Sequence, residues 1–124
     1  MRKEAVKTGP ALRNLPFSPG IRLGNLLFIS GQGPNDKDGK VIPGDIREQT
    51  LITLENFKRI VVAAGSTMAN VLQTVVYLKD LNDFAGMNQV YSEFFPDPKP
   101  ARTTIQAALL FEMRVEIQGT AYIP

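Results

Sequence analysis

Residues 45–65 read DIREQTLITLENFKRIVVAAG, and no other stretch of the chain predicts a structural element so clearly. Asp45 is followed three residues later by Glu48, which is the spacing of a capping box at a helix N-terminus. Apolar residues then recur at helical spacing, and Gly65 stands where helices commonly end. These apolar residues are Ile46, Leu54, Phe57, Val61 and Ala64, with Leu51 beside them. The stretch predicts an amphipathic helix that buries one face.

Residues 71–78, VLQTVVYL, follow this helix and are typical of a β-strand. Residues 75–78 are apolar at every position, so both faces of the strand are apolar. Strands of this kind are usually covered on both sides. The sequence therefore predicts a sheet that is buried on two faces.

Turn signals divide the part of the chain before the helix. The first 20 residues are rich in proline and glycine and read as an irregular arm. Residues 21–23 and 26–30 flank Gly24-Asn25, which predicts a hairpin. Residues 31–44 carry repeated glycine and proline turn pairs and read as a loop.

A second helix and two more strands are expected after residue 78. Asn82 or Asp83 is placed to cap the helix, whose apolar stripe is Phe84, Met87, Tyr91, Phe94 and Phe95. Strands follow at about 101–109 and 114–123, joined by a turn near 110–112. The order β-β-α-β-α-β-β predicts one α/β (α+β) domain over residues 1–124, with two helices on one face of a mixed sheet. Because no element remains to cover the other face, we expect an oligomer.

The composition narrows the possible chemistry. The 124 residues include no histidine, cysteine or tryptophan, which removes Ser-His-Asp and Cys-His catalysis and the usual zinc sites. Asp, Glu, Lys and Tyr are left as acid or base groups. Apolar runs are too short to cross a membrane and the N-terminus lacks a signal peptide's apolar stretch, so we expect a cytoplasmic protein. The net charge of +2 and the scattered basic residues argue against a nucleic-acid partner.

Polar side chains alternate along the last two expected strands, because successive residues point to opposite faces of a sheet. Arg102 and Thr104 share one face of the first strand, and Glu116 shares a face with Gln118 of the second. If these strands form a hairpin, Arg102 lies opposite about residue 119, close to Glu116. Guanidinium binds a carboxylate through a planar fork, and a carboxylate can take a proton from water. The alternative is an ordinary cross-strand ion pair or two solvated side chains.

Other residues carry a weaker signal. The segment Ser30-Gly31-Gln32-Gly33-Pro34 can present backbone N–H groups to an anion, and its alternative is a plain tight turn. Tyr91 and Phe84 read as core residues. Asn88 is a polar residue beside the apolar stripe of the second helix.

Short motifs recur in a fixed order along nearly the whole chain. They are LGN at 23–25, ISGQ at 29–32 with Pro34, AAG at 63–65, VYLKDLNDF at 76–84, Asn88, Tyr91, Phe94-Phe95, PART at 100–103 and VEI at 115–117. In this combination the chain resembles the reactive intermediate deaminase family, known as RidA and formerly as YjgF or L-PSP endoribonuclease-like proteins. The resemblance implies a chorismate-mutase-like fold and a homotrimer with active sites in the clefts between subunits. It also implies hydrolysis of 2-iminobutanoate, 2-iminopropanoate or related imines, formed from 2-aminoacrylate-type enamines, to a 2-keto acid and ammonia, without a metal or organic cofactor.

The resemblance assigns roles position by position. Arg102 resembles the family's arginine that pairs with the substrate carboxylate, and Glu116 the acid that orients or activates the hydrolytic water. Thr104 stands where many members have a cysteine whose backbone carbonyl helps to hold that water. Ser30, Gly31 and Asn88 match residues that line the pocket, and Phe17 stands where many members have tyrosine. Phe17 therefore lacks a hydroxyl at the pocket entrance, which bears on substrate preference.

Three other functions compete with imine hydrolysis of 2-imino acids. A non-catalytic trimer could bind a small carboxylate for regulation. The enzyme class could hold while the substrate is another enamine or imine, such as an aminomuconate. RNA cleavage, the older description of the family, has the least support because the charge is balanced and histidine is absent.

Overall fold

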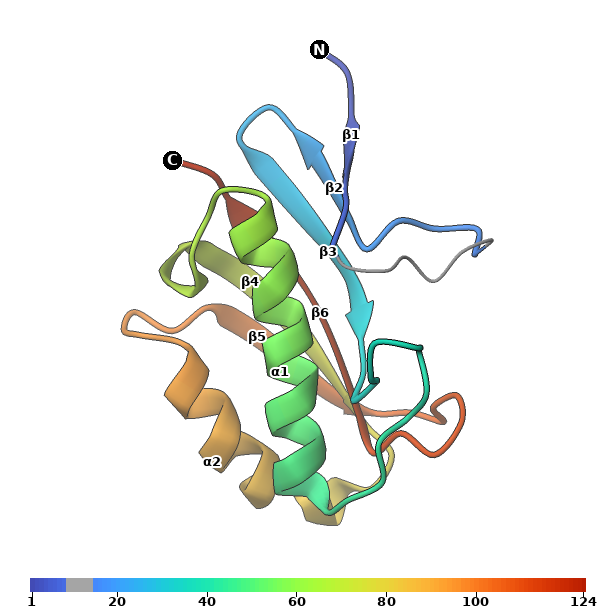
Figure 1. The fold of residues 1–124 in the computed structure, drawn as a ribbon. Coiled ribbons are helices and arrows are strands. Elements are labelled where there is room, and N and C mark those ends of the chain that lie inside the picture. Colours follow the sequence, from blue (N-terminus) through green and yellow to red (C-terminus); the bar gives the residue numbers. More distant parts are fainter. Residues whose placement is uncertain (9–14) are drawn as a thin grey trace.

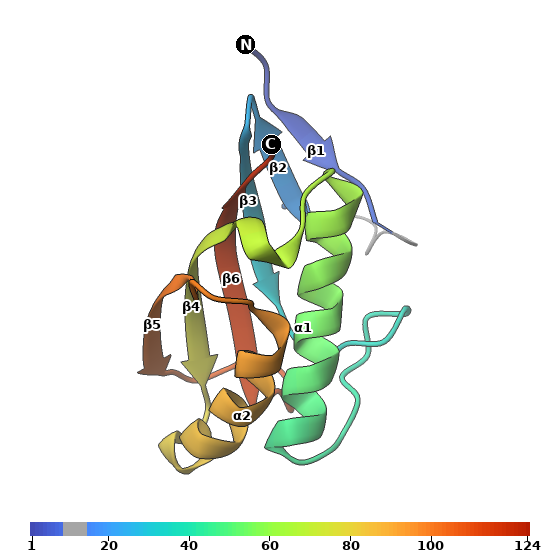
Figure 2. The same cartoon turned by 90° about the vertical axis from the view of Figure 1, so that its left-hand side faces the viewer.

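Two helices cover one face of a six-stranded mixed sheet in the computed structural model, which describes residues 1–8 and 15–124 (Figures 1 and 2). The strands are β1 (Glu4–Val6), β2 (Gly20–Leu23), β3 (Leu26–Gln32), β4 (Val71–Leu78), β5 (Ala101–Gln106) and β6 (Val115–Tyr122). The helices are α1 (Ile46–Ala63) and α2 (Phe84–Phe94), with short 3-10 turns at Met68–Asn70 and Leu81–Asp83. The strand order across the sheet is β1-β2-β3-β6-β4-β5. The expected fold class is confirmed.

The α1 helix forms as its sequence predicts. The Asp45 side chain accepts a hydrogen bond from the Glu48 N–H at 2.9 Å, and the Asp45 N–H donates back to Glu48 Oε1 at 3.3 Å. Gly65 follows the helix with a φ of +90°, a conformation that favours glycine. Leu54 and Phe57 are fully buried, so this helix packs its apolar face on the sheet.

The β2–β3 hairpin also matches its prediction. Leu23 pairs with Leu26 across the turn, where Gly24 has a φ of +58°. Beyond β3, residues 33–44 form the expected loop, which contains one isolated bridge between Asn35 and Val41. The Asn56 side chain of α1 fixes this loop by donating to the carbonyls of Gly33 and Asn35.

The last two strands do not form the hairpin on which the expected proximity of Arg102 and Glu116 depended. β5 pairs in parallel with β4, while β6 lies antiparallel between β3 and β4. The α2 helix carries the chain back from the end of β4 to its start, and this crossover makes the next strand parallel. β5 also ends at Gln106, earlier than predicted, and residues 107–114 lead to β6.

Two smaller expectations need correction. The first 20 residues are not wholly irregular, because β1 pairs with β2 and buries Val6; residues 9–14 of the expected arm lie outside the described residues. At the start of α2, Asp83 occupies the N-cap position without a side-chain capping bond. Asp80 instead accepts from the Asn82 N–H, and Asp83 lies 3.8 Å from the Arg114 guanidinium.

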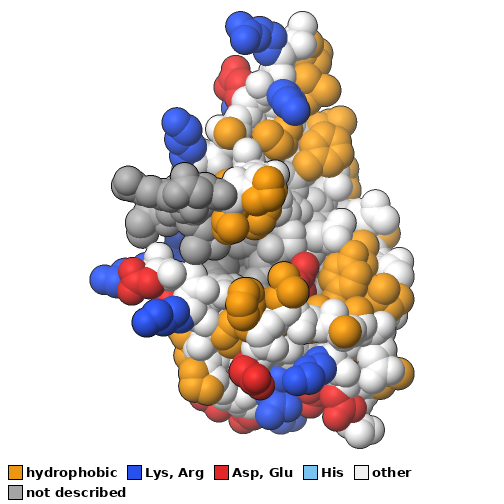
Figure 3. All heavy atoms as spheres, turned by 90° about the vertical axis from the view of Figure 1, so that its right-hand side faces the viewer, with side chains coloured by type: hydrophobic (Ala, Val, Ile, Leu, Met, Phe, Trp, Pro, Cys, Tyr) orange, Lys and Arg blue, Asp and Glu red, His pale blue; other side chains and the backbone are white. Residues whose placement is uncertain are grey.

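The two faces of the sheet have different surroundings in a single chain. Thr74, Val76 and Leu78 of β4 point toward the helices and are fully buried. Val75 and Tyr77 point to the opposite face, which we call the open face, and are only half-buried. Apolar side chains on the open face that are at least two-fifths exposed are Leu26, Phe28, Ile105 and Tyr122. Figure 3 shows hydrophobic side chains gathered in patches along one side of the molecule.

Candidate active site

Arg102 lies on the helix side of the edge strand β5. It pairs with Thr74 of β4, whose side chain points to the helices, so the Arg102 side chain shares that face. The guanidinium carbon lies 4.7 Å from the centre of the Tyr91 ring and 5.7 Å from that of Phe84. Its Nη1 is 3.9 Å from Met87 Sδ. Within the described ranges Arg102 forms no ion pair, which leaves its charge available to a ligand anion.

Asn88 and Thr104 belong to the helix and the strand that meet at this arginine. Asn88 follows Met87 on α2, and its Oδ1 is buried without a hydrogen-bond partner among the described residues. Thr104 is two residues beyond Arg102 on the same face of β5, opposite Val76. We call Arg102, Thr104 and Asn88 the arginine group. A buried amide oxygen without a donor usually indicates a missing partner, such as a water or a ligand N–H.

Glu116 lies on the open face of β6. Its register partner is Tyr77 of β4, which is also on the open face. The carboxylate lies over Gly31, where an added Cβ would come 2.2 Å from Glu116 Oε2. Only glycine therefore leaves room for this position of the carboxylate. Burial raises the pKa of Glu116 above its usual range, toward values useful in proton transfer.

Of the other predicted residues of the pocket, Gly31 lies against Glu116, Ser30 precedes Gly31 on β3, and Phe17 belongs to a segment bonded to Ser30. Ser30 and Gly31 belong to the last part of β3, where the pairing with β6 shifts register between Ile29 and Gln32. Ser30 Oγ donates to the Ser18 carbonyl at 2.6 Å, which fixes the segment that carries Phe17. Phe17 is 58% exposed. We call Glu116, Gly31, Ser30 and Phe17 the glutamate group.

The arginine group and the glutamate group do not meet within one chain. Arg102 of β5 pairs with Thr74 of β4, and Thr74 pairs with Gly119 of β6. Arg102 and Gly119 are therefore in the same register, as the hairpin would have required, but β4 lies between their strands. Glu116 is level with Tyr77 and points to the opposite face. The expectation that one chain brings guanidinium and carboxylate into a single region is therefore wrong, because it rested on the incorrect β5–β6 pairing.

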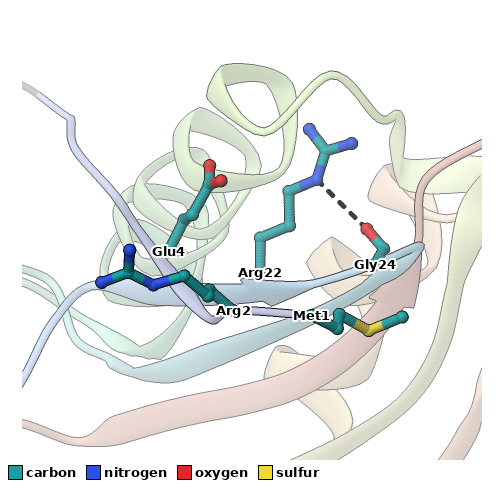
Figure 4. A pocket seen from close by; sticks show the side chains of 5 residues that line it. All are labelled: Met1, Arg2, Glu4, Arg22 and Gly24. Carbon is teal, nitrogen blue, oxygen red and sulfur yellow. Dashed lines mark hydrogen bonds between the residues drawn. The ribbon is translucent and has the colours of Figure 1, made fainter.

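Two recesses elsewhere contain none of the predicted residues. One is lined by Met1, Arg2, Glu4, Arg22 and Gly24 at the β1 edge of the sheet (Figure 4). There the Arg22 Nε donates to the Gly24 carbonyl at 3.2 Å, and the two arginine side chains extend in different directions. The other is a mainly apolar recess between the outer surfaces of α1 and α2, lined by residues that include Leu51, Val62 and Phe94. Neither brings together groups that suggest catalysis.

Residues 1–8 and 15–124 contain no group of three or more Asp and Glu side chains arranged to hold a metal ion. Within the same residues, no helix combines the length and apolar character needed to cross a bilayer.

Comparison with known proteins places the chain in a family. Residues 9–123 match the family described as endoribonuclease L-PSP. The chain belongs to the RidA/YjgF/L-PSP family. A RutC family protein of Pyrococcus horikoshii is 46% identical over 97% of this chain and 98% of that relative. TdcF of Escherichia coli, which carries the name of a reactive intermediate deaminase, is 39% identical over 86% of this chain and 85% of its own length.

Solved structures of RidA-family proteins share the fold over almost the whole chain. RidA from an Antarctic Psychrobacter aligns with a TM-score of 0.89 at 34% identity, covering 97% of this chain and 99% of that chain. Escherichia coli TdcF with bound serine aligns with a TM-score of 0.87 at 34% identity, covering 98% and 99%. The expected membership of the RidA family is confirmed.

The sequence of this RidA-family chain did not reveal which side chains surround the Arg102 guanidinium. Tyr91 is buried as predicted, but its ring also faces the guanidinium. Phe84, predicted as core, is 45% exposed and flanks the same guanidinium. The available signal was the helical spacing of Phe84, Met87 and Tyr91, which places all three on the side of α2 that meets β5.

Proposed function

We propose that this protein hydrolyses reactive 2-imino acids, such as 2-iminobutanoate and 2-iminopropanoate, to 2-keto acids and ammonia. The observation that carries the proposal is the set of side chains around Arg102. Its guanidinium packs against aromatic rings and approaches Met87, and the next residue, Asn88, has a buried oxygen that lacks a partner among the described residues. A small molecule with a carboxylate and a neighbouring N–H donor complements both groups.

The arginine group and the glutamate group form one site only between two subunits. We propose a homotrimer in which the arginine group of one protomer faces the glutamate group of the next. The exposed apolar side chains of the open face support assembly, because a patch of this kind usually marks an interface. The deaminase TdcF with bound serine, a small amino acid with a carboxylate, supports the ligand class.

Hydrolysis of an iminium needs limited help from the protein. Arg102 binds the carboxylate bidentately and fixes the C=N carbon close to a water molecule. Glu116 in its ionised form takes a proton from that water as the water oxygen bonds to carbon. The protonated Glu116 then gives its proton to the nitrogen of the carbinolamine. As the C–N bond breaks, ammonia leaves with the bonding electrons, and the hydroxyl oxygen releases its proton to Glu116 while the C=O bond forms. That proton passes to the ammonia and gives ammonium. The net reaction joins the iminium carboxylate and water to give 2-keto acid and ammonium.

The remaining residues complete the pocket in this proposal. The backbone carbonyl of Thr104 helps to hold the water, so replacing the family's cysteine by threonine preserves the acting group. Asn88 Oδ1 accepts a hydrogen bond from the substrate nitrogen. Ser30 and Gly31 line the part of the pocket next to the Glu116 carboxylate. Phe17 covers the entrance with an apolar ring.

Phe17 also favours a second candidate, a non-catalytic trimer that binds a small carboxylate. Its ring is exposed and offers no hydroxyl to orient a substrate. In that case a keto acid binds at Arg102 without turnover of the imine.

One assay separates these functions. An amino-acid oxidase generates imines in solution from a panel of amino acids, and semicarbazide competes with hydrolysis by trapping them. With the purified protein we expect less trapped product and faster release of keto acid and ammonia. The Arg102→Ala variant should lose this effect, while Arg22→Ala, an exposed arginine on β2, should retain it. An unchanged rate of imine hydrolysis with intact binding of 2-oxobutanoate would establish the non-catalytic alternative instead.

A further inference from the structure

The Tyr91 side chain is held between two neighbouring strands. Its hydroxyl shares a buried 2.6 Å hydrogen bond with Thr74 Oγ1 of β4. Its ring lies under Arg102 of β5, with 4.7 Å between the guanidinium carbon and the ring centre. Thr74 and Arg102 are register partners. One tyrosine is therefore bonded to one residue of this pair and stacked against the other.

The ring has little freedom to move. Phe95 packs beside it, with 4.5 Å between ring centres. The ring is 5% exposed, and burial raises the pKa of Tyr91, so the hydroxyl stays neutral and able to hydrogen-bond. A fixed aromatic face gives the guanidinium a defined plane on which to rest.

We propose that Tyr91 is a positioning residue, which holds the Arg102 guanidinium in the plane needed to receive a carboxylate through two N–H donors. The inference rests on the proposed function, because it assumes that Arg102 is the carboxylate clamp. An unsupported arginine must lose rotamer freedom when it binds, which weakens affinity by about tenfold. Tyr91 removes much of this loss by ordering the side chain beforehand.

The first test measures binding of 2-oxobutanoate by calorimetry, so that it does not depend on turnover. Tyr91→Leu removes the ring and keeps an apolar side chain in the core. We expect binding to weaken by about five- to tenfold, since the cation–π contact and the ordering of the arginine are lost together. Phe57→Leu is the matched control. Phe57 is a fully buried ring of α1, and it is not one of the two rings, Phe84 and Tyr91, that face the Arg102 guanidinium. Equal weakening in both variants, or none in Tyr91→Leu, overturns the inference.

The second test separates positioning from stability. Thr74→Val and Tyr91→Phe each leave one buried hydroxyl without its partner and should lower the melting temperature. The double variant removes both hydroxyls, so its stability should recover toward that of the unmodified protein. If the hydrogen bond serves to fix the ring, affinity for 2-oxobutanoate should remain weakened in the double variant. Recovery of affinity together with stability would show a purely structural bond.

A lysine in place of Arg102 shows whether Tyr91 acts through the guanidinium. In an Arg102→Lys background the planar group is absent, so Tyr91→Leu should weaken binding no further. If Arg102→Lys and Arg102→Ala both bind 2-oxobutanoate like the unmodified protein, the clamp itself fails, and the inference fails with it. If both lose affinity while Tyr91→Leu does not, only the positioning role is wrong. If binding follows the expected pattern but no imine is hydrolysed, the inference stands without the proposed activity.

Discussion

Arg102 and Glu116 lie on opposite faces of one sheet, on strands β5 and β6 that β4 separates. A substrate cannot touch both side chains of the same chain. The proposed reaction nevertheless needs one group to bind the carboxylate and another to activate water.

Two inactive variants should restore activity when they share an assembly. Arg102→Ala keeps the glutamate group, and Glu116→Gln keeps the arginine group. Unfolding and refolding an equal mixture should make about a quarter of the inter-subunit sites complete, because each site takes one group from each neighbour. The measurement is imine hydrolysis by the mixture against each variant refolded alone. A mixture as inactive as its components would contradict a divided site.

The role of Glu116 can be tested through pH. Because burial raises its pKa, ionisation should be complete only above the usual range for glutamate. We expect kcat/KM for imine hydrolysis to rise with pH through this raised pKa, and Glu116→Gln to abolish that limb and lower the rate about 10²–10³-fold. A limb that persists in Glu116→Gln would assign it to another group.

Stability should respond to the same ionisation in the opposite direction. A carboxyl whose pKa is higher in the folded state favours folding most below its unfolded pKa. That contribution is lost as the pH rises through the folded pKa. Glu116→Gln should therefore raise the melting temperature at neutral pH relative to the unmodified protein, and change it less in acid. The Glu55→Gln variant, at an exposed position of α1, is the control.

Gly31 should be required for activity more than for folding. An alanine Cβ there would approach Glu116 Oε2 to 2.2 Å, so the carboxylate must move. Because the displaced atom is the end of a flexible side chain, the fold can absorb the change. We expect Gly31→Ala to lower kcat/KM by about tenfold or more by displacing the water-activating group, with a small change in melting temperature. Gly44→Ala, whose Cβ would lie 3.1 Å from the Glu48 side chain, should retain activity.

The same substitution should have opposite effects at two buried threonines. Thr53 Oγ1 is buried on α1 without a hydrogen-bond partner among the described residues, so Thr53→Val should stabilise the protein by about 1 kcal/mol. Thr74→Val breaks the bond to Tyr91 and should destabilise it by about 1–3 kcal/mol. Chemical denaturation of both variants measures the difference. Destabilisation by Thr53→Val would mean that its hydroxyl has a partner in solution.

Local signals predicted the local structure well. The capping box at Asp45, the glycine after α1 and the Gly24 turn each depend on residues a few positions apart, and all three form as expected. Membership of the RidA family was also predictable, because its motifs lie along most of the chain.

Strand pairing was harder to predict because it depends on contacts distant in sequence. The short connection before β6 was compatible with a hairpin, yet β6 pairs with β3 and β4 instead. The alternation of side chains correctly placed Arg102 and Thr104 on one face of β5, and Glu116 and Gln118 on one face of β6. It could not show which face of each strand meets the helices, and that choice separates the two groups.

β5 is an edge strand, and among the described strands only β4 pairs with it. Unpaired N–H and C=O groups at such an edge invite strand addition by other chains, which leads to aggregation. Arg102 places a charge on the inner side of this edge, and Pro100 stands immediately before it. Both features are known deterrents to strand addition. The charge that protects this edge from strand addition is therefore the same charge that binds the carboxylate in the proposed function.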